Sequence, residues 1–237
     1  MRPDPLEDVR RVARGYGLDV EPLLALLAPF LPSYLELALD DGGFEIITGG
    51  RGVARELASA AASLGLEAPA RDAFLLAASR APEVMVGLKV DAARRAPPTL
   101  YHRAMLPLGE GLALLGEVGL PEHVREALAH RLAPAQTLYG LGFSTAGGAL
   151  RVKTYVLGDV AGRVGFRSVR ATAAGVEIDE RVYEANADAR ATGLGCARRA
   201  ERALGASVLG HVGRSRARGA KVYVERVGAI PTDTSAR

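Results

Sequence analysis

Several kinds of residue and segment are scarce in this sequence, and each scarcity excludes a class of structure. Tryptophan is absent, and aromatic residues make up only 5% of the 237 residues. The lone cysteine, Cys196, excludes an internal disulfide and a cysteine-ligated metal cluster, and it is expected to be a free buried thiol. No apolar run reaches the roughly 18 residues that a membrane-spanning helix requires. The first residues, MRPDPLEDVRR, lack the apolar stretch of a signal peptide. These features predict a cytoplasmic protein that does not span a membrane.

The charged residues favour no nucleic-acid or metal site. The net charge is only +3, although arginines gather in the C-terminal half. Arg214, Arg216 and Arg218 are interpreted as a solvated hairpin loop, because the aromatic residues that stack on single-stranded nucleic acid do not alternate with them. The four histidines are far apart, except for two separated by seven residues, so no metal site is expected.

The hydrophobic pattern alternates between helices and pairs of strands. Helical periodicity covers residues 6–30 with a break near Gly15 and Gly17, 53–64, 108–132 with a break near Gly119, and 187–204. Period-2 alternation with turn residues predicts five hairpins, formed by residues 33–39 with 44–48, 84–90 with 99–106, 137–143 with 150–157, 163–170 with 175–183, and 207–213 with 220–227.

Helix and hairpin in succession predict an antiparallel α+β protein, because a parallel sheet needs strands that alternate singly with helices. With about ten strands, closure into a barrel with the helices outside removes the exposed sheet edges. No linker divides the chain, so we expect one monomeric domain over residues 1–237, with a flexible tail at about 228–237.

The hairpins also share a short pattern in which a basic residue and a tyrosine are separated by one position. Lys153 and Tyr155, Arg181 and Tyr183, and Lys221 and Tyr223 follow it, and the second hairpin has the reverse order, Tyr101 and Arg103. Such self-similarity predicts repeated αββ units.

Strand parity puts each basic residue on the same face as its tyrosine, since alternate residues point to opposite faces. One arrangement leaves this polar face in water on an open sheet. The other curls it inward, so that cations and tyrosines line a lumen that needs an anionic ligand, because unpaired buried charges are costly. The closed barrel accounts better for the tyrosines, which an open sheet would expose.

Arg151-x-Lys153-x-Tyr155, Lys221-x-Tyr223 and the successive αββ units resemble the aromatic prenyltransferases of the ABBA, or PT-barrel, family. The resemblance covers most of the chain through short motifs. It implies transfer of an allylic group, of dimethylallyl or geranyl type, from its diphosphate to an aromatic small molecule or peptide side chain. No cofactor is required, and Mg²⁺ is not indicated because no Asp-Asp-x-x-Asp cluster is present.

Position by position, the resemblance also assigns roles to residues. Glu36 would accept a proton from the acceptor or orient it, or it would form an ion pair in the lumen. The tyrosines would shield the allylic cation; they are Tyr101, Tyr155, Tyr183 and Tyr223. The residues that would hold the diphosphate are Lys89, Arg103, Arg151, Lys153, Arg181 and Lys221.

Two other functions stay open at this stage. The same cations could serve a non-catalytic barrel that binds a phosphorylated or acidic small molecule. The arginine-rich C-terminal half could instead bind nucleic acid or a peptide.

Overall fold

The computed structural model of the protein describes residues 4–80, 83–92, 97–133, 135–160, 163–177, 181–185, 194–205, 211–215 and 219–227. The helices are α1 (Pro5–Tyr16), α2 (Glu21–Leu27), α3 (Ala54–Ser63), α4 (Ala68–Ala78), α5 (Leu108–Glu117), α6 (Glu122–Leu132) and α7 (Gly195–Leu204). The strands are β1 (Leu35–Leu39), β2 (Gly43–Arg51), β3 (Glu83–Asp91), β4 (Thr99–Pro107), β5 (Thr137–Ala146), β6 (Ala149–Val160), β7 (Arg163–Thr172), β8 (Gly175–Val176), β9 (Arg181–Ala185), β10 (His211–Ser215) and β11 (Gly219–Val227). Among these described helices, none is long and apolar enough to cross a membrane.

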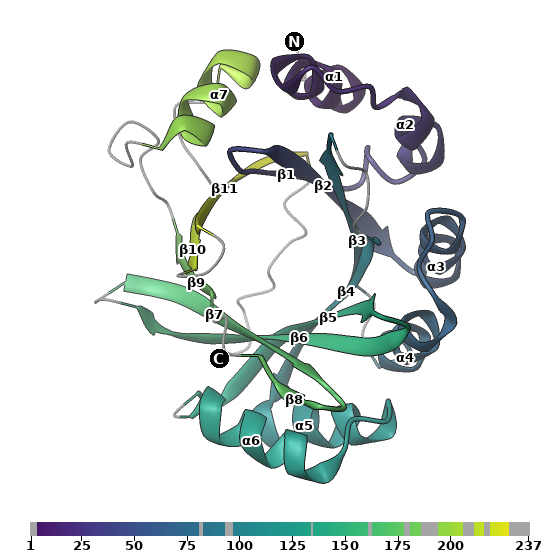
Figure 1. Ribbon diagram of the computed structural model, residues 1–237, viewed down its shortest axis with the longest axis vertical. Helices are drawn as coiled ribbons and strands as arrows, with labels where there is room; N and C mark the ends of the chain where they lie inside the picture. Colours follow the sequence, from purple (N-terminus) through teal and green to yellow (C-terminus); the bar gives the residue numbers. More distant parts are fainter. Residues whose placement is uncertain are drawn as a thin grey trace.

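The strands form one antiparallel sheet that closes on itself. Hydrogen bonding runs through β6, β5, β4, β3, β2, β1, β11, β10, β9 and β7, and β7 pairs again with β6. The short strand β8 lies outside this ring, where it pairs with the end of β7. Figure 1, viewed along the barrel, shows the ring of strands with the helices around it. The expected closed α+β barrel of about ten strands, with helices outside, is therefore confirmed.

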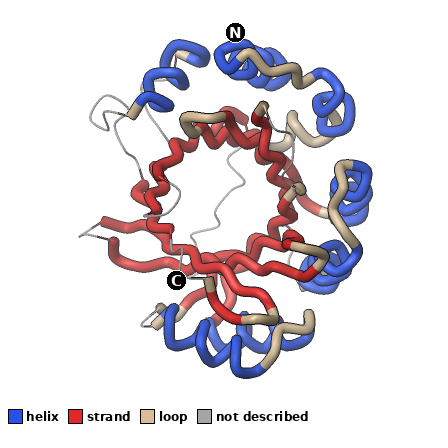
Figure 2. Tube along the Cα trace, viewed as in Figure 1, coloured by secondary structure: helices blue, strands red, loops and turns tan. Residues whose placement is uncertain are grey.

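The main hydrophobic core fills the layer between the barrel and the helices. The aliphatic face of each strand points outward, as Leu37, Phe44 and Ile46 illustrate, and all three are fully buried. In register, Leu37 lies between Ile46 of β2 and Val224 of β11. Figure 2 shows the blue helices outside the red barrel. Because this outer layer holds the aliphatic side chains, the polar residues of the same strands point into the lumen.

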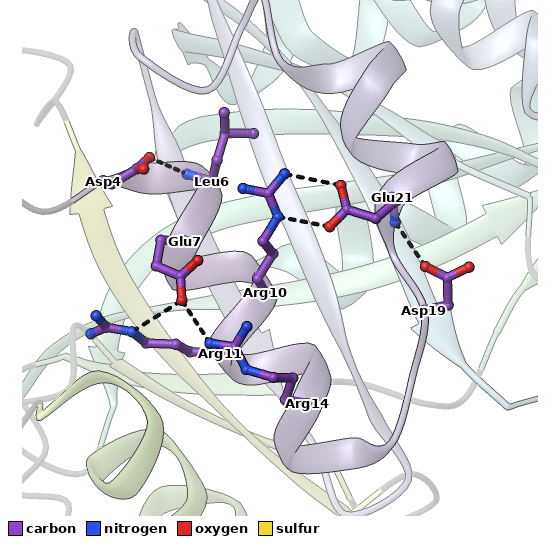
Figure 3. A network of polar contacts seen from close by, with 8 residues as sticks. All are labelled: Asp4, Leu6, Glu7, Arg10, Arg11, Arg14, Asp19 and Glu21. Carbon is purple, nitrogen blue, oxygen red and sulfur yellow. Dashed lines mark hydrogen bonds and ion pairs between the residues drawn. The ribbon is translucent and has the colours of Figure 1, made fainter.

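Helices α1 and α2 are joined at the surface by charged side chains (Figure 3). The side chain of Asp4 accepts a hydrogen bond from the backbone N–H of Leu6 and caps α1. Arg10 of α1 binds both carboxylate oxygens of Glu21, at 2.7 and 2.9 Å. Gly17 ends α1 in the left-handed conformation, which accounts for the helix break expected near this glycine.

The hairpin turns follow their sequence chemistry. Gly147 and Gly148, between β5 and β6, both adopt positive φ, at 57° and 81°. The side chain of Asp40 accepts a hydrogen bond from the N–H of Gly42 and closes the turn between β1 and β2.

Three elements differ from the sequence predictions. Helix α4 was not predicted. Its buried face consists mostly of alanines, so the segment shows little difference in hydrophobicity between its buried and exposed faces. Residues 175–183 do not form one strand: β8 ends at Val176 and β9 begins at Arg181. Helix α7 begins at Gly195, and residues 187–193 of the expected helix lie outside the described part.

Candidate functional site

The barrel encloses a cavity of about 640 Å³, lined by the polar faces of its strands. A volume of this size suits a ligand with the dimensions of a typical small molecule or cofactor. The charged residues of the lining are Lys89, Arg103, Arg151, Lys153, Arg170, Arg181 and Lys221, opposed by Glu36, Asp40, Glu45 and Glu225. Among the described residues, cations therefore exceed carboxylates on this wall, and all six predicted diphosphate-binding residues lie on it.

Lysine is rare in the chain and confined to this wall. Of the 30 lysines and arginines only three are lysines, namely Lys89, Lys153 and Lys221, and each of them lines the cavity. Elsewhere the chain uses arginine for its positive charge. A lysine carries a compact ammonium group that titrates when buried, whereas a guanidinium stays charged. The lumen thus differs chemically from the rest of the surface.

The four tyrosines predicted to shield a cation form a continuous row of rings, here called the tyrosine belt. The ring centroids of Tyr101 and Tyr155 are 6.2 Å apart, those of Tyr155 and Tyr183 are 6.0 Å apart, and those of Tyr183 and Tyr223 are 5.7 Å apart. His211 stacks on Tyr223 with its centroid at 4.1 Å. The pKa of His211 falls to about 3 because of burial and the nearby Lys153, so the imidazole is neutral. All four tyrosines of the belt line the cavity.

Glycines on neighbouring strands make room for these rings. Gly142 is opposite Tyr101 and Gly213 is opposite Tyr183 in the strand register. A Cβ on either glycine would lie 3.0 Å from the ring of the tyrosine opposite it. Each tyrosine therefore lies across the bare backbone of the adjacent strand, an arrangement that a side chain at the glycine would disturb.

Lys153 is at the centre of the belt. Its ammonium group donates a hydrogen bond to the hydroxyl of Tyr183 at 2.7 Å and lies 4.5 Å from the ring centroid of Tyr155. Burial lowers the pKa of Lys153, and the contact with Tyr183 counteracts part of this effect. A cation held against aromatic rings in a water-poor space can neutralise an entering anion strongly.

Glu45 of β2 connects a second lysine to the belt. One of its carboxylate oxygens lies 3.1 Å from the ammonium of Lys221, and the other accepts a hydrogen bond from the hydroxyl of Tyr101 at 3.0 Å. Burial raises the pKa of Glu45, but Lys221 and Lys153 outweigh it, so the pKa lies below its usual value. Glu45 is therefore ionised at neutral pH and acts as a counter-anion inside the cation cluster.

Glu36 belongs to a different group of residues in the same cavity. It accepts a hydrogen bond from the hydroxyl of Tyr34 at 2.8 Å and lies opposite Glu225 in the strand register. Burial raises the pKa of Glu36 to about 7, and the nearby carboxylates add to this effect while Arg103 opposes it. A carboxyl group with such a pKa can accept or donate a proton near neutral pH.

The remaining predicted cations have partners of their own. Lys89 forms an ion pair with Asp91 at 3.1 Å, and Arg151 forms one with Glu177 at 2.9 Å. The guanidinium of Arg103 lies 4.9 Å from the ring centroid of Tyr139, apart from the lysines. Arg181 is only 8% exposed, and its partner is the side chain of Tyr223. The structure thus brings Lys153 and Lys221 together around Glu45, and it places Arg103 with the Glu36 group instead.

Several lumen residues were not singled out from the sequence. Glu45, Arg170 and His211 all line the cavity. Parity alone could have found Glu45 and Arg170, since each alternates with outward-facing residues on its strand. His211 was considered only as a histidine without metal-ligand spacing. Its position two residues before Gly213, on the same face of β10, was the available signal.

The other sequence predictions concern residues outside this cavity. Cys196 on α7 is free and buried, as expected. Within the described part of the chain, no group of three or more histidine, cysteine or acidic side chains is arranged to hold a metal ion. Arg214 is exposed, and Arg216 and Arg218 lie outside the described residues.

Comparison with known proteins gives no family assignment: no protein-family model matches the chain, and neither does any curated protein sequence.

Proposed function

We propose that the barrel is an aromatic prenyltransferase, which binds an allylic diphosphate in the lumen and moves its prenyl group to an aromatic small molecule or peptide side chain. The observation that carries this proposal is the position of Lys153. Its ammonium is at once within hydrogen-bonding distance of Tyr183 and over the ring of Tyr155, so an anion-binding cation directly adjoins the tyrosine belt.

The chemistry follows from that adjacency. When the bond between the allylic carbon and the diphosphate oxygen breaks, the electron pair leaves with the diphosphate, and positive charge develops on the prenyl group. Lys153 and Lys221 stabilise the growing negative charge on the leaving group. The faces of the tyrosine belt attract the allylic cation, by about 1–2 kcal/mol per ring where water is excluded.

The acceptor then forms a bond to the allylic carbon and loses a proton. Glu36 is the candidate base, because its pKa of about 7 leaves it partly ionised at neutral pH. The hydroxyl of Tyr34 donates to this carboxylate and fixes its orientation. In this scheme protein cations neutralise the diphosphate, which supports a reaction that does not require a metal.

The direct test is to incubate the protein with dimethylallyl and geranyl diphosphates and a mixed library of aromatic compounds and peptides. A product heavier than an acceptor by one prenyl group is expected, and it should disappear in the Lys153→Met variant. If diphosphates bind but no acceptor is alkylated under any condition, the chain is instead a non-catalytic barrel for phosphorylated or acidic small molecules. That second function depends on the same excess of cations over carboxylates in the lumen.

A further inference from the structure

Within the proposed diphosphate site, a carboxylate already occupies a position among the cations. Glu45 contacts Lys221 through one oxygen and Tyr101 through the other. Its Cα partner on the next strand is Lys89. The lysines that would hold an anionic ligand are therefore partly neutralised by the protein itself.

The wall around Glu45 is shaped to hold it there. Gly87 of β3 lies beneath the contact between Glu45 and Tyr101. A Cβ at this position would be 2.4 Å from a carboxylate oxygen of Glu45 and 2.6 Å from the ring of Tyr101. With its side chain only 14% exposed, Glu45 has little access to water as an alternative partner. Asp40 adds a second, longer contact to Lys221, at 3.8 Å.

We infer that Glu45 is an internal competitor for the ligand anion, and that it determines the specificity of the lumen for multiply charged anions such as a diphosphate. This inference rests on the proposed function of the site. A singly charged ligand that displaces Glu45 from Lys221 exchanges one anion for another and gains little. A diphosphate carries more charge than the carboxylate that it displaces, and the cavity that it would enter is lined by both Lys153 and Lys221.

The inference predicts that removing the charge of Glu45 tightens anion binding. In Glu45→Gln, the ligand meets neither the repulsion of the carboxylate nor its competition for Lys221. We expect the affinity for inorganic pyrophosphate, measured by isothermal titration calorimetry, to rise at least about tenfold, since one unit charge a few ångströms away acts strongly in a partly buried site. Glu7→Gln is the matched control, because Glu7 pairs with Arg14 on the outer surface of α1, and its affinity should equal that of the wild type.

A second variant tests the same competition without changing the charge. Tyr101→Phe removes the hydroxyl that holds Glu45 and keeps the ring, so Glu45 should be displaced more easily and pyrophosphate should bind severalfold more tightly. Unchanged or weaker binding in both variants, with a wild type that binds pyrophosphate, would overturn the role of Glu45 and leave the anion site in place. Failure of the wild type and of both variants to bind pyrophosphate would overturn the inference and the proposed diphosphate site together.

Discussion

Replacing Lys153 by methionine separates the contribution of this residue to ligand binding from its contribution to folding. Methionine keeps the length of the side chain and removes the ammonium, which donates to Tyr183 at 2.7 Å and contacts the Tyr155 ring. In the free protein the lost hydrogen bond costs about 1 kcal/mol, and the lost cation–π contact about 0.5–1 kcal/mol. Relief from burying a charge, which is what lowers the pKa of Lys153, offsets these losses. We expect the free energy of unfolding to change by no more than about 1 kcal/mol.

Ligand binding should respond much more strongly. A hydrogen bond to a charged group is worth about 1.5–3 kcal/mol, so Lys153→Met should weaken pyrophosphate binding by about 10- to 150-fold. Titration calorimetry measures the affinity, and urea denaturation of the same samples measures stability. Lys89→Met is the control on the same wall: its ammonium pairs with Asp91 and its side chain is 39% exposed, so the loss should stay below about fivefold. Equal affinity of Lys153→Met and wild type would show that the Lys153 ammonium does not hold the anion, and so would an equal loss in both variants.

Two further predictions concern the pH response and the packing of the lumen wall. Because the pKa of Glu36 in the folded protein is about 7, above its ordinary value of 4.5, folding takes up a proton between these values, and the free energy of unfolding should fall as pH rises through that window. Glu36→Gln should remove about 2–3 kcal/mol of this decrease between pH 4.5 and 8, measured by urea denaturation; an unchanged pH dependence would show that Glu36 is not the group responsible. Gly87→Ala should destabilise the fold by about 1–3 kcal/mol, because its Cβ would collide with Glu45 and Tyr101. Gly109→Ala, at the exposed second position of α5, meets no atom within 4 Å and should change the free energy of unfolding by no more than about 0.5 kcal/mol, so an equal loss in both variants would contradict the packing argument.

The hairpins and the inward faces of the strands could be predicted from the sequence, because period-2 alternation is a local property. Lys153 and Tyr155 share a face of β6 for this reason alone. The strand pairing that closes the barrel could not be predicted from local pattern, because β1 pairs with β11 and these strands lie at opposite ends of the chain. Closure was predicted only because it removes the exposed edges of the sheet. Helix α4 was missed because alanine gives little contrast between a buried and an exposed face.

Within the site, parity identified which residues face inward but not which of them are in contact. Glu45 and Lys221 are 176 residues apart in sequence, and their ion pair depends on the curvature and register of the closed barrel. The same limit applies to Arg103. It shares the lumen with Lys153, as expected, but the register of β4 places it beside Tyr139 instead of among the lysines.

The distribution of lysine allows a direct measurement of whether the lumen cations bind an allylic diphosphate. All three lysines line the cavity, so acetylation of side-chain amines reports on the lumen alone, with the α-amino group as an internal reference. The protein is acetylated briefly with and without geranyl diphosphate, and modification at each lysine is quantified by peptide mass spectrometry. We predict strong protection of Lys153 and Lys221 by the diphosphate, weaker protection of Lys89, and none of the α-amino group. Equal acetylation of Lys153 and Lys221 with and without saturating geranyl diphosphate would contradict the claim.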